Sequence, residues 1–399
     1  MWAPLLLFAT HTAVSGMSLS ILGTDCQTSV GTNGSCIRRS ECQWALEELK
    51  LGRRPKYCLN SLPTVIVCCP ADGATTPSDD LPPPGLMSNR SKAVGDVARR
   101  KCKEYGELVY QEVEVPALIA RRERRSQCVS TVKSLIVGGS KAEAKEFPHM
   151  ALLGCRCGSS HLDCDGDLNF FCGGSLISPN FILTAAHCLY ARNKTVQLVL
   201  LGSLDRINMT EADYEQLIGV AERIPHPKYT SSSTYHDIAL LRLESDAVLS
   251  GHVRPACLHT GEPMDQQAVP VATGWGFTDL VGEPSDVLKK VGLRLVADDA
   301  CRSSYASHNP TRLANGIDSA SQLCAGGELN RDTCFGDSGG PLQVYATNTT
   351  QTPDEPFCMY KILGVTSFSK FACGLKDPGV YTRVSSYVAW IENIVWPQQ

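Results

Sequence analysis

Three short motifs contain the side chains that could carry out acyl transfer in this 399-residue chain. Ser338 lies in FGDSGGP, His187 in TAAHC and Asp237 in DIALL. A serine hydroxyl is a weak nucleophile, and it reacts only when a base removes its proton and dipoles stabilise the oxyanion. Histidine suits that proton transfer near neutral pH, and a buried carboxylate can hold its ring in the required tautomer. The set predicts a nucleophile, a base and an orienting acid.

Each motif also has a purely structural interpretation. The glycine-rich run around Ser338 is typical of a tight turn, so this motif alone is an even choice between a turn and a nucleophile. His187 could simply precede a disulfide cysteine, Asp237 could cap a strand, and His226 and His236 are alternative bases. The order His, Asp, Ser is one of three known chain orders for this geometry, which favours the catalytic interpretation.

The composition indicates a protein of the secretory route. Residues 1–15, with an end that could extend to about residue 20, are apolar and contain no acid, which predicts a signal peptide. Nineteen cysteines fit an oxidising compartment, and the net charge of −4 argues against nucleic acid as the main partner. We expect a secreted, extracellular protein without a membrane span. Its predicted glycosylation sites are Asn33, Asn89, Asn193, Asn208 and Asn348.

Residues 25–70 are predicted to form a small domain that depends on disulfides. Six cysteines lie between Cys26 and Cys69 among too few apolar residues for an unaided core. The spacing lacks paired Cys-x-x-Cys elements and histidine, so three disulfides are favoured over a zinc site. The sequence alone leaves their connectivity open. Within the segment, SECQWALEELK has a serine cap and helical apolar spacing, which predicts a short helix.

Residues 71–135 are predicted to be a linker and pro-region. The first half is rich in Pro, Ser, Gly and Asp without an apolar period, which is typical of an extended linker. The second half is charged and contains the isolated Cys102 and Cys128. Its basic run, which ends at Arg125, is interpreted as solvated charge, with processing after Arg125 as the alternative.

From Ile136 onward the sequence changes to short apolar strands separated by Gly, Pro and Asn. The pattern continues over about 260 residues, so residues 136–399 are predicted to form an all-β domain of two packed barrels. The exception is SSYVAWIENIVW, where Val388, Ile391 and Val395 mark one face of a C-terminal helix.

The motifs TAAHC, DIALL, GWG, GDSGGP and GVYTRV resemble those of the chymotrypsin-like serine proteases. The adjacent Cys68 and Cys69 after PTVIV resemble the clip domain of arthropod members, nearest to the Snake-like group. The resemblance implies a chymotrypsin-like double β-barrel with a C-terminal helix, preceded by a small disulfide-rich clip domain. It also implies a serine endopeptidase whose oxyanion hole is formed by the N–H groups of Gly336 and Ser338.

The same resemblance assigns the pocket for the side chain before the scissile bond. Asp332 would lie at its base, where an apolar side chain would leave the carboxylate unpaired and Arg or Lys would pair with it. Ser367, Ser369 and Gly379 would form its walls. Ser369 replaces the usual glycine, which would narrow the entrance.

The resemblance further implies that the intact chain is a zymogen. A cut between Leu135 and Ile136 would free an α-amino group that pairs with Asp337. Because Leu135 is neither Arg nor Lys, an enzyme with Asp332 in its pocket should not cut there. The implied partners are an upstream activating protease, a downstream zymogen and serpin-type inhibitors, in an extracellular cascade of innate immunity or development.

Two other functions stay open. The first is a terminal protease that activates prophenoloxidase or a cytokine precursor. The second is a binding protein whose clip domain docks partners while the protease fold serves as a scaffold. No cofactor or metal is implied. Glu211 and Glu215 could belong to a calcium loop, but Asp205 is poorly placed as a third ligand, so solvated acids are favoured.

The resemblance implies seven disulfides and leaves five cysteines over. Cys102 could pair with Cys358, and a bond within the loop from Cys155 to Cys164, which also contains Cys157, would leave one odd thiol. The implied pairs are Cys26–Cys68, Cys36–Cys58, Cys42–Cys69, Cys128–Cys257, Cys172–Cys188, Cys301–Cys324 and Cys334–Cys373.

Overall fold

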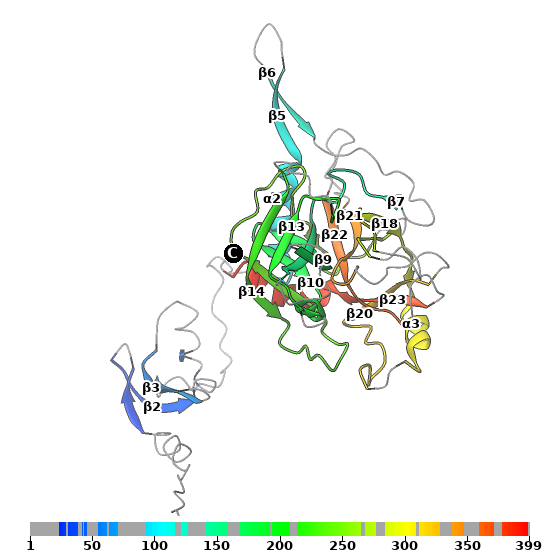
Figure 1. The fold of residues 1–399 in the computed structure, drawn as a ribbon. Coiled ribbons are helices and arrows are strands. Elements are labelled where there is room, and N and C mark those ends of the chain that lie inside the picture. The colour runs from blue at the N-terminus through cyan, green and yellow to red at the C-terminus, as the bar shows by residue number, and fades with distance from the viewer. Residues whose placement is uncertain are drawn as a thin grey trace, which may run out of the picture. The chain divides into compact units, whose positions relative to one another are not determined.

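In a computed structural model the chain forms two compact units, Met1–Asn89 and Arg90–Gln399, which are described separately (Figure 1). Among the described residues, no helix combines the length and the apolar character that crossing a bilayer requires. The predicted signal peptide lies outside them. The structure describes residues 24–28, 31–38, 42, 44–45, 55–61, 64–70, 93–115, 121–126, 140–157, 168–191, 194–207, 214–264, 268–276, 284–308, 311–327, 337–346, 359–370 and 377–397.

The first unit contains an antiparallel sheet with the strand order β1-β2-β4-β3. Successive side chains of a strand point to opposite faces, so the adjacent Cys68 and Cys69 of β4 reach different partners. The structure contains Cys26–Cys68, Cys36–Cys58 and Cys42–Cys69. Of the predicted helical segment, Cys42, Trp44 and Ala45 are described, and Trp44 and Ala45 are helical. The strands are β1 (Asp25–Gln27), β2 (Asn33–Arg38), β3 (Tyr57–Ser61) and β4 (Thr64–Pro70).

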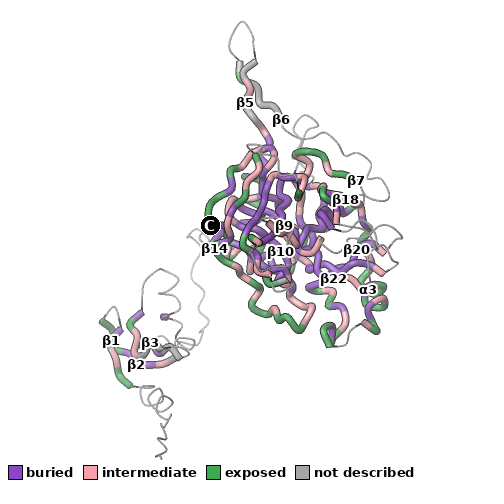
Figure 2. Tube along the Cα trace, in the orientation of Figure 1, coloured by how far each residue is buried: buried purple, intermediate pink, exposed green. Residues whose placement is uncertain are grey.

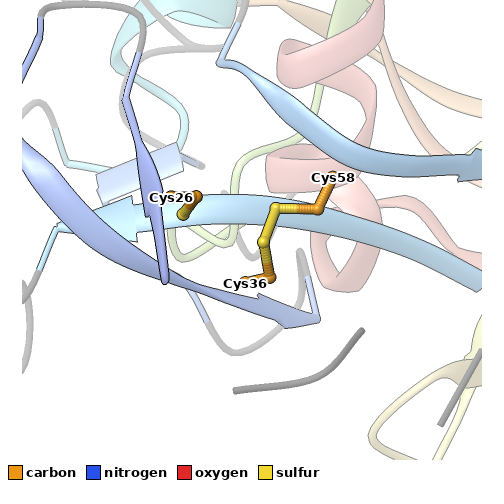
Figure 3. Close-up of side chains that lie close together, drawn as sticks. All are labelled: Cys26, Cys36 and Cys58. Atoms are coloured by element: carbon orange, nitrogen blue, oxygen red, sulfur yellow. A yellow bond between two sulfur atoms is a disulfide. The ribbon is translucent and has the colours of Figure 1, made fainter. Parts of the chain in front are cut away.

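Three cysteines of this unit lie close enough together to resemble a metal site. The sulfur atoms of Cys26, Cys36 and Cys58 lie within 4.8 Å of one another. Figure 3 shows the sulfur–sulfur bond between Cys36 and Cys58, with Cys26 beside it. Metal ligation requires thiolates, and all three sulfurs are already in disulfides, so the cluster is structural.

The first half of the second unit is a closed barrel in the order β10-β15-β14-β13-β8-β9. Most of its strands are largely buried, and β15 exposes only Arg242, whereas β14 buries only Ile218 and Val220. Figure 2 shows this buried centre. The strands are β8 (Met150–Arg156), β9 (Leu168–Ser178), β10 (Phe181–Thr184), β13 (Leu198–Leu201), β14 (Gln216–Pro225) and β15 (Ala239–Leu243), with the short β11 (Tyr190–Ala191) and β12 (Lys194–Thr195) beside them.

The second half is a nine-stranded sheet in the order β19-β20-β23-β22-β21-β17-β18-β7, with β16 paired to β22. The mostly-β architecture with a C-terminal helix confirms the predicted fold class. The strands are β7 (Ser140–Lys141), β16 (Cys257–Leu258), β17 (Val271–Gly274), β18 (Lys289–Gly292), β19 (Leu295–Val296), β20 (Gln322–Gly326), β21 (Pro341–Ala346), β22 (Met359–Phe368) and β23 (Pro378–Arg383). The helices are α3 (Asp298–Tyr305) and α4 (Val388–Val395), which follows the 3₁₀ turn η5 (Val384–Tyr387).

One helix lies where the sequence predicted a linker. Helix α2 (Asp96–Gly106) begins after Gly95, and its apolar face belongs to the core of the barrel. The carboxylate of Glu392 on α4 accepts hydrogen bonds from the N–H groups of Gly95 at 3.0 Å and Ala98 at 2.8 Å. These are N–H groups that the first turn of a helix leaves without internal partners. Most of this helix lies in the charged second half of the range 71–135, which the sequence assigned to a linker and pro-region.

Helix α2 also corrects the predicted disulfide between Cys128 and Cys257. Cys102 of α2 is bonded to Cys257 of β16, with a Cα–Cα distance of 4.9 Å. The face of α2 that carries Cys102 packs against β16, so this sulfur is the one held in reach. The proposed pairing of Cys102 with Cys358 is wrong for the same reason.

A hairpin follows α2 after the 3₁₀ turn η3 (Glu107–Val109). Strands β5 (Tyr110–Val115) and β6 (Arg121–Ser126) pair with each other, and Figure 1 shows the hairpin extending from the second unit. The basic run that ends at Arg125 is thus a strand. Arg122 lies 3.8 Å from Glu112 in an exposed ion pair.

Non-reducing peptide mapping should find Cys102 linked to Cys257. We expect one tryptic species that contains both cysteines and separates into two peptides on reduction, because the structure bonds Cys102 to Cys257. A species that links Cys128 to Cys257 would contradict this prediction. The matched control is Cys301–Cys324, whose two cysteines lie in different tryptic peptides and which the same digest should recover as a linked pair.

Candidate active site

The first residue of the predicted triad, His187, follows strand β10. It lies in the 3₁₀ turn η4 (Ala186–Leu189), where its neighbour Cys188 is bonded to Cys172 of β9. The sulfur of Cys188 lies 3.8 Å from Nε2 of His187. The disulfide therefore fixes the turn that carries His187, and the cluster of Cys172, Cys188 and His187 is not a metal site because both sulfurs are bonded.

Asp237 contacts both the ring and the main chain of His187. Its Oδ2 lies 2.7 Å from Nδ1 of His187, and its Oδ1 accepts a hydrogen bond from the main-chain N–H of His187 at 2.9 Å. The side chain of Asp237 is 5% exposed and that of His187 is 29% exposed. A buried carboxylate at Nδ1 leaves Nε2 as the ring nitrogen that can accept a proton.

Two hydroxyl groups fix Asp237 in this position. Ser367 of β22 donates to Oδ2 at 2.5 Å, and Thr382 of β23 donates to the main-chain carbonyl of Asp237 at 2.7 Å. Sequence analysis assigned Ser367 only to a pocket wall and did not identify Thr382. No local signal could have found them, because both act across more than 100 residues of chain.

Ser338 lies in a β-turn closed by a hydrogen bond of 2.8 Å from Gly340 N–H to the Asp337 carbonyl. The third residue, Gly339, has φ of 77°, a conformation that favours glycine. A Cβ atom at Gly339 would collide with Thr184 Oγ1 and lie 3.1 Å from the sulfur of Cys188. The structural interpretation of the motif is therefore confirmed, since Ser338 lies in a tight turn, and this turn packs through Gly339 against the disulfide of the His187 turn.

Asp337, the predicted switch residue, points away from this turn toward β17. Its Oδ1 accepts a hydrogen bond from Gly276 N–H at 2.8 Å. A Cβ atom at Gly276 would lie 2.7 Å from this carboxyl group, so glycine is required for the close approach. The two residues of the predicted activation cleavage site, Leu135 and Ile136, lie outside the described residues.

The predicted pocket is described only in part. Ser367 and Ser369 lie at the end of β22, and Gly379 lies on the paired strand β23. The structure thus brings the three proposed wall positions together where β22 ends and its neighbour β23 begins. Asp332 and Gly336 lie outside the described residues, so the base of the pocket and one donor of the oxyanion hole stay predictions.

The other predicted sites are described to different extents. Cys301–Cys324 is present, and Cys334–Cys373 lies outside the described residues. Cys155 is the odd thiol and is buried, whereas Cys157 is in a disulfide. Asn33 is exposed, and the remaining predicted glycosylation sites are not described. Glu211 is also outside the described part of the chain, so the calcium loop of Glu211, Glu215 and Asp205 stays untested.

The charges of His187 and Asp237 stabilise each other. Burial alone would lower the pKa of His187, but the charge of Asp237 and their hydrogen bond outweigh it, so this pKa lies above 6.5. Burial alone would raise the pKa of Asp237, but the charge of His187 and the hydrogen bonds from His187 and Ser367 hold it below 3.8. The pair favours an ionised acid beside a histidine able to take a proton.

Asp237→Asn should therefore lower the pKa of His187. We expect the imidazole to titrate above 6.5 when Asp237 is present and below 6.5 in the variant, because burial then acts without the opposing charge. The measurement is an NMR titration of the histidine C–H signals in a Ser338→Ala background. An unchanged His187 pKa would show that the charge of Asp237 does not act on this ring.

Comparison with known proteins agrees with this geometry. Residues 136–391 match the family model described as Trypsin. Serine protease snk of Drosophila melanogaster is 36% identical over 381 residues, which cover 94% of this chain and 79% of that protein. Phenoloxidase-activating enzyme 1 of Spodoptera litura is 30% identical over 419 residues, or 99% of each chain. CLIP domain-containing serine protease B9 of Anopheles gambiae is 29% identical over 380 residues, or 90% and 82% of the two chains.

The Trypsin match covers more than half of the chain and includes His187, Asp237 and Ser338. The similarity to the insect proteases continues through the N-terminal half, where the three disulfides of the first unit lie. The chain therefore belongs to the trypsin family of serine endopeptidases and is similar over nearly its full length to clip-domain serine proteases of insects.

Proposed function

We propose that Ser338, His187 and Asp237 are the catalytic triad of this endopeptidase. The observation that carries the proposal is the 2.7 Å contact between Asp237 and Nδ1 of His187, beside the turn that presents Ser338. In the first step Nε2 of His187 takes the proton of Ser338 as its oxygen attacks the peptide carbonyl. The N–H groups of Gly336 and Ser338 stabilise the oxyanion, and His187 then protonates the leaving amine.

The proposed specificity is cleavage after Arg or Lys. Asp332 pairs with the basic side chain, and the small residues Ser367, Ser369 and Gly379 leave room for it. An apolar side chain would leave the Asp332 carboxylate buried without a partner, which is costly. The proposal is supported by the position of Asp332 six residues before Ser338 in a chain of the trypsin family.

The proposed control is a cut between Leu135 and Ile136. The new α-amino group of Ile136 pairs with Asp337, whose other oxygen can keep the hydrogen bond from Gly276. An ion pair formed in a buried site can switch a loop between two arrangements, because the unpaired charge is strongly disfavoured. The N-terminal part of the chain stays attached after the cut through Cys102–Cys257.

The purified zymogen should not activate itself. After incubation alone at high concentration, we expect the Leu135–Ile136 bond to stay intact, because a pocket that contains Asp332 disfavours leucine before the cut. N-terminal sequencing measures the outcome. Concentration-dependent cleavage at this bond by wild type, but not by Ser338→Ala, would contradict the requirement for another protease.

In the proposed pathway this enzyme is an intermediate in an extracellular cascade of innate immunity or development. An upstream protease activates it, it cuts a downstream zymogen after Arg or Lys, and serpin-type inhibitors end its activity. The similarity to insect serine proteases, among them phenoloxidase-activating enzyme 1, supports a role in a protease cascade, and the intermediate step is proposed within that role. Secretion after removal of the signal peptide is proposed with it, and the disulfides suit that compartment.

A terminal protease that activates prophenoloxidase is the second candidate. It is favoured by the similarity to phenoloxidase-activating enzyme 1 over 99% of both chains. The two candidates differ in substrate. Incubation of the activated enzyme with prophenoloxidase and with protease zymogens, followed by sequencing of the new N-termini, separates them.

A further inference from the structure

Two histidines that the proposed mechanism does not use lie on either side of Asp237. His236 directly precedes Asp237, and its carbonyl accepts a hydrogen bond from Ile238 N–H at 2.8 Å. The N–H of His226 donates to the carbonyl of Ile238 at 3.0 Å. The tight turn at Asp237 is therefore held on one side by His236 and on the other by His226.

His236 has a backbone conformation that few residues adopt. Its φ is 55°, and among the described residues only Lys145 is another non-glycine residue with positive φ. Such a conformation persists only where surrounding contacts impose it. Here Nδ1 of His236 lies 2.9 Å from the hydroxyl of Tyr387, and its ring stacks on His226 at 5.2 Å with 23° between the planes.

The ring of His226 is fixed as closely as that of His236. The main-chain N–H of Lys228 donates to Nδ1 of His226 at 3.3 Å, and the rings of Tyr387 and Trp390 pack edge-on against it. A main-chain N–H can only donate, so Nδ1 of His226 must be unprotonated for this bond to exist. The stacked arrangement in the structure is therefore that of a neutral His226.

We propose that His236 is a positioning residue for Asp237 and that its stack with His226 makes this positioning sensitive to protonation. The proposal rests on the triad assignment given above. With neutral rings, the Tyr387 hydroxyl donates to His236 and the turn holds Asp237 under His187. When both rings are charged, two like charges lie within one stack and the bond from Lys228 to His226 is lost. The ring contacts that hold His236 in its positive-φ conformation are then weakened, and with them the placement of Asp237 in the turn.

Protons can reach the pair from solvent. His236 lines an open pocket of about 630 Å³, together with Lys228, Asp318 and Arg302. Burial is the main cause that lowers the pKa of each histidine. The charge of Lys228 lowers the pKa of both His226 and His236 further, and the charge of His236 also lowers that of His226. The charge of Asp318 opposes this by raising the pKa of His236. The pair should therefore become charged at lower pH than His187.

The pH profile of the activated enzyme tests the proposal. Residues 131–135 are replaced by an enteropeptidase recognition sequence, and kcat and KM are measured on an Arg-containing peptide substrate. Protonation of His187 alone gives a slope of one in a plot of log(kcat/KM) against pH. We expect the wild-type plot to become steeper than one on the acid side of pH 6.5, because both histidines take up their protons below that value.

Two asparagine variants remove the titrating rings and keep their contacts. Asn tolerates positive φ and can accept a hydrogen bond from Tyr387 or from Lys228 N–H. His236→Asn and His226→Asn should each restore a slope of one down to pH 5. At pH 8, His236→Ala should lower kcat about fivefold with KM unchanged, and His236→Asn should recover most of this loss.

His252→Gln is the matched control, because His252 also stacks on an aromatic ring, that of Tyr214, but lines a different pocket. The His252→Gln variant should keep the wild-type dependence of log(kcat/KM) on pH. A slope of one in wild type, or an unchanged profile in both asparagine variants, would overturn the inference. If Ser338→Ala stays active, the proposed triad fails instead, so the two failures are distinguishable.

Discussion

Replacing Ser338 with alanine is expected to lower kcat by about 10⁴- to 10⁶-fold, because the attacking oxygen is removed while the rest of the site stays in place. The hydrogen bond between Gly173 and Ser338 uses the main-chain carbonyl of Ser338, which alanine retains. The variant should therefore fold normally. The measurement is hydrolysis of an Arg-containing peptide after an engineered cut before Ile136.

The double variant provides the control for a shared mechanism. His187→Ala should cost about as much as Ser338→Ala, and the two together should cost little more than either alone, because the residues act as one unit. Thermal unfolding shows whether each protein is folded. A folded Ser338→Ala variant with wild-type activity would contradict the assignment of the nucleophile, and additive losses would contradict the proton transfer between the two residues.

Replacing Asp332 with serine is expected to lower kcat/KM for Arg and Lys substrates by about 10⁴-fold, because the basic group of the substrate would then be buried without its partner. The measurement compares peptides that differ only in the residue before the cut. Asp299→Ser is a matched control, because Asp299 is almost fully exposed on α3 and should leave kcat/KM unchanged. An Asp332→Ser enzyme that still prefers Arg would place the specificity elsewhere.

The residues of the proposed triad could be named from sequence because their signals are local. His187, Asp237 and Ser338 each lie within a short motif, and the strand pattern predicted the β architecture around them. The bonds that support the triad could not be predicted in the same way. Ser367 reaches Asp237 across 130 residues and Thr382 across 145, so only the folded chain shows them.

Helix α2 was missed because charge dominates its sequence. Arg99, Arg100, Lys101 and Lys103 give the segment the composition of a solvated linker. The apolar signal that could have identified it is a face of Val97, Ala98, Cys102 and Tyr105, which are all in the core. Once this helix packs on the barrel, Cys102 lies next to Cys257. Cysteine spacing alone could not distinguish Cys102 from Cys128 as the partner.

The central proposal is that a new N-terminus at Ile136 activates this serine endopeptidase. The most direct measurement compares the chain before and after an engineered cut between residues 135 and 136, with a denatured protein as substrate and sequencing of every new N-terminus. We predict cleavage after Arg or Lys only in the cut form, and none in the cut Ser338→Ala form. Equal activity before and after the cut, or cleavage without preference for Arg or Lys, would contradict the account.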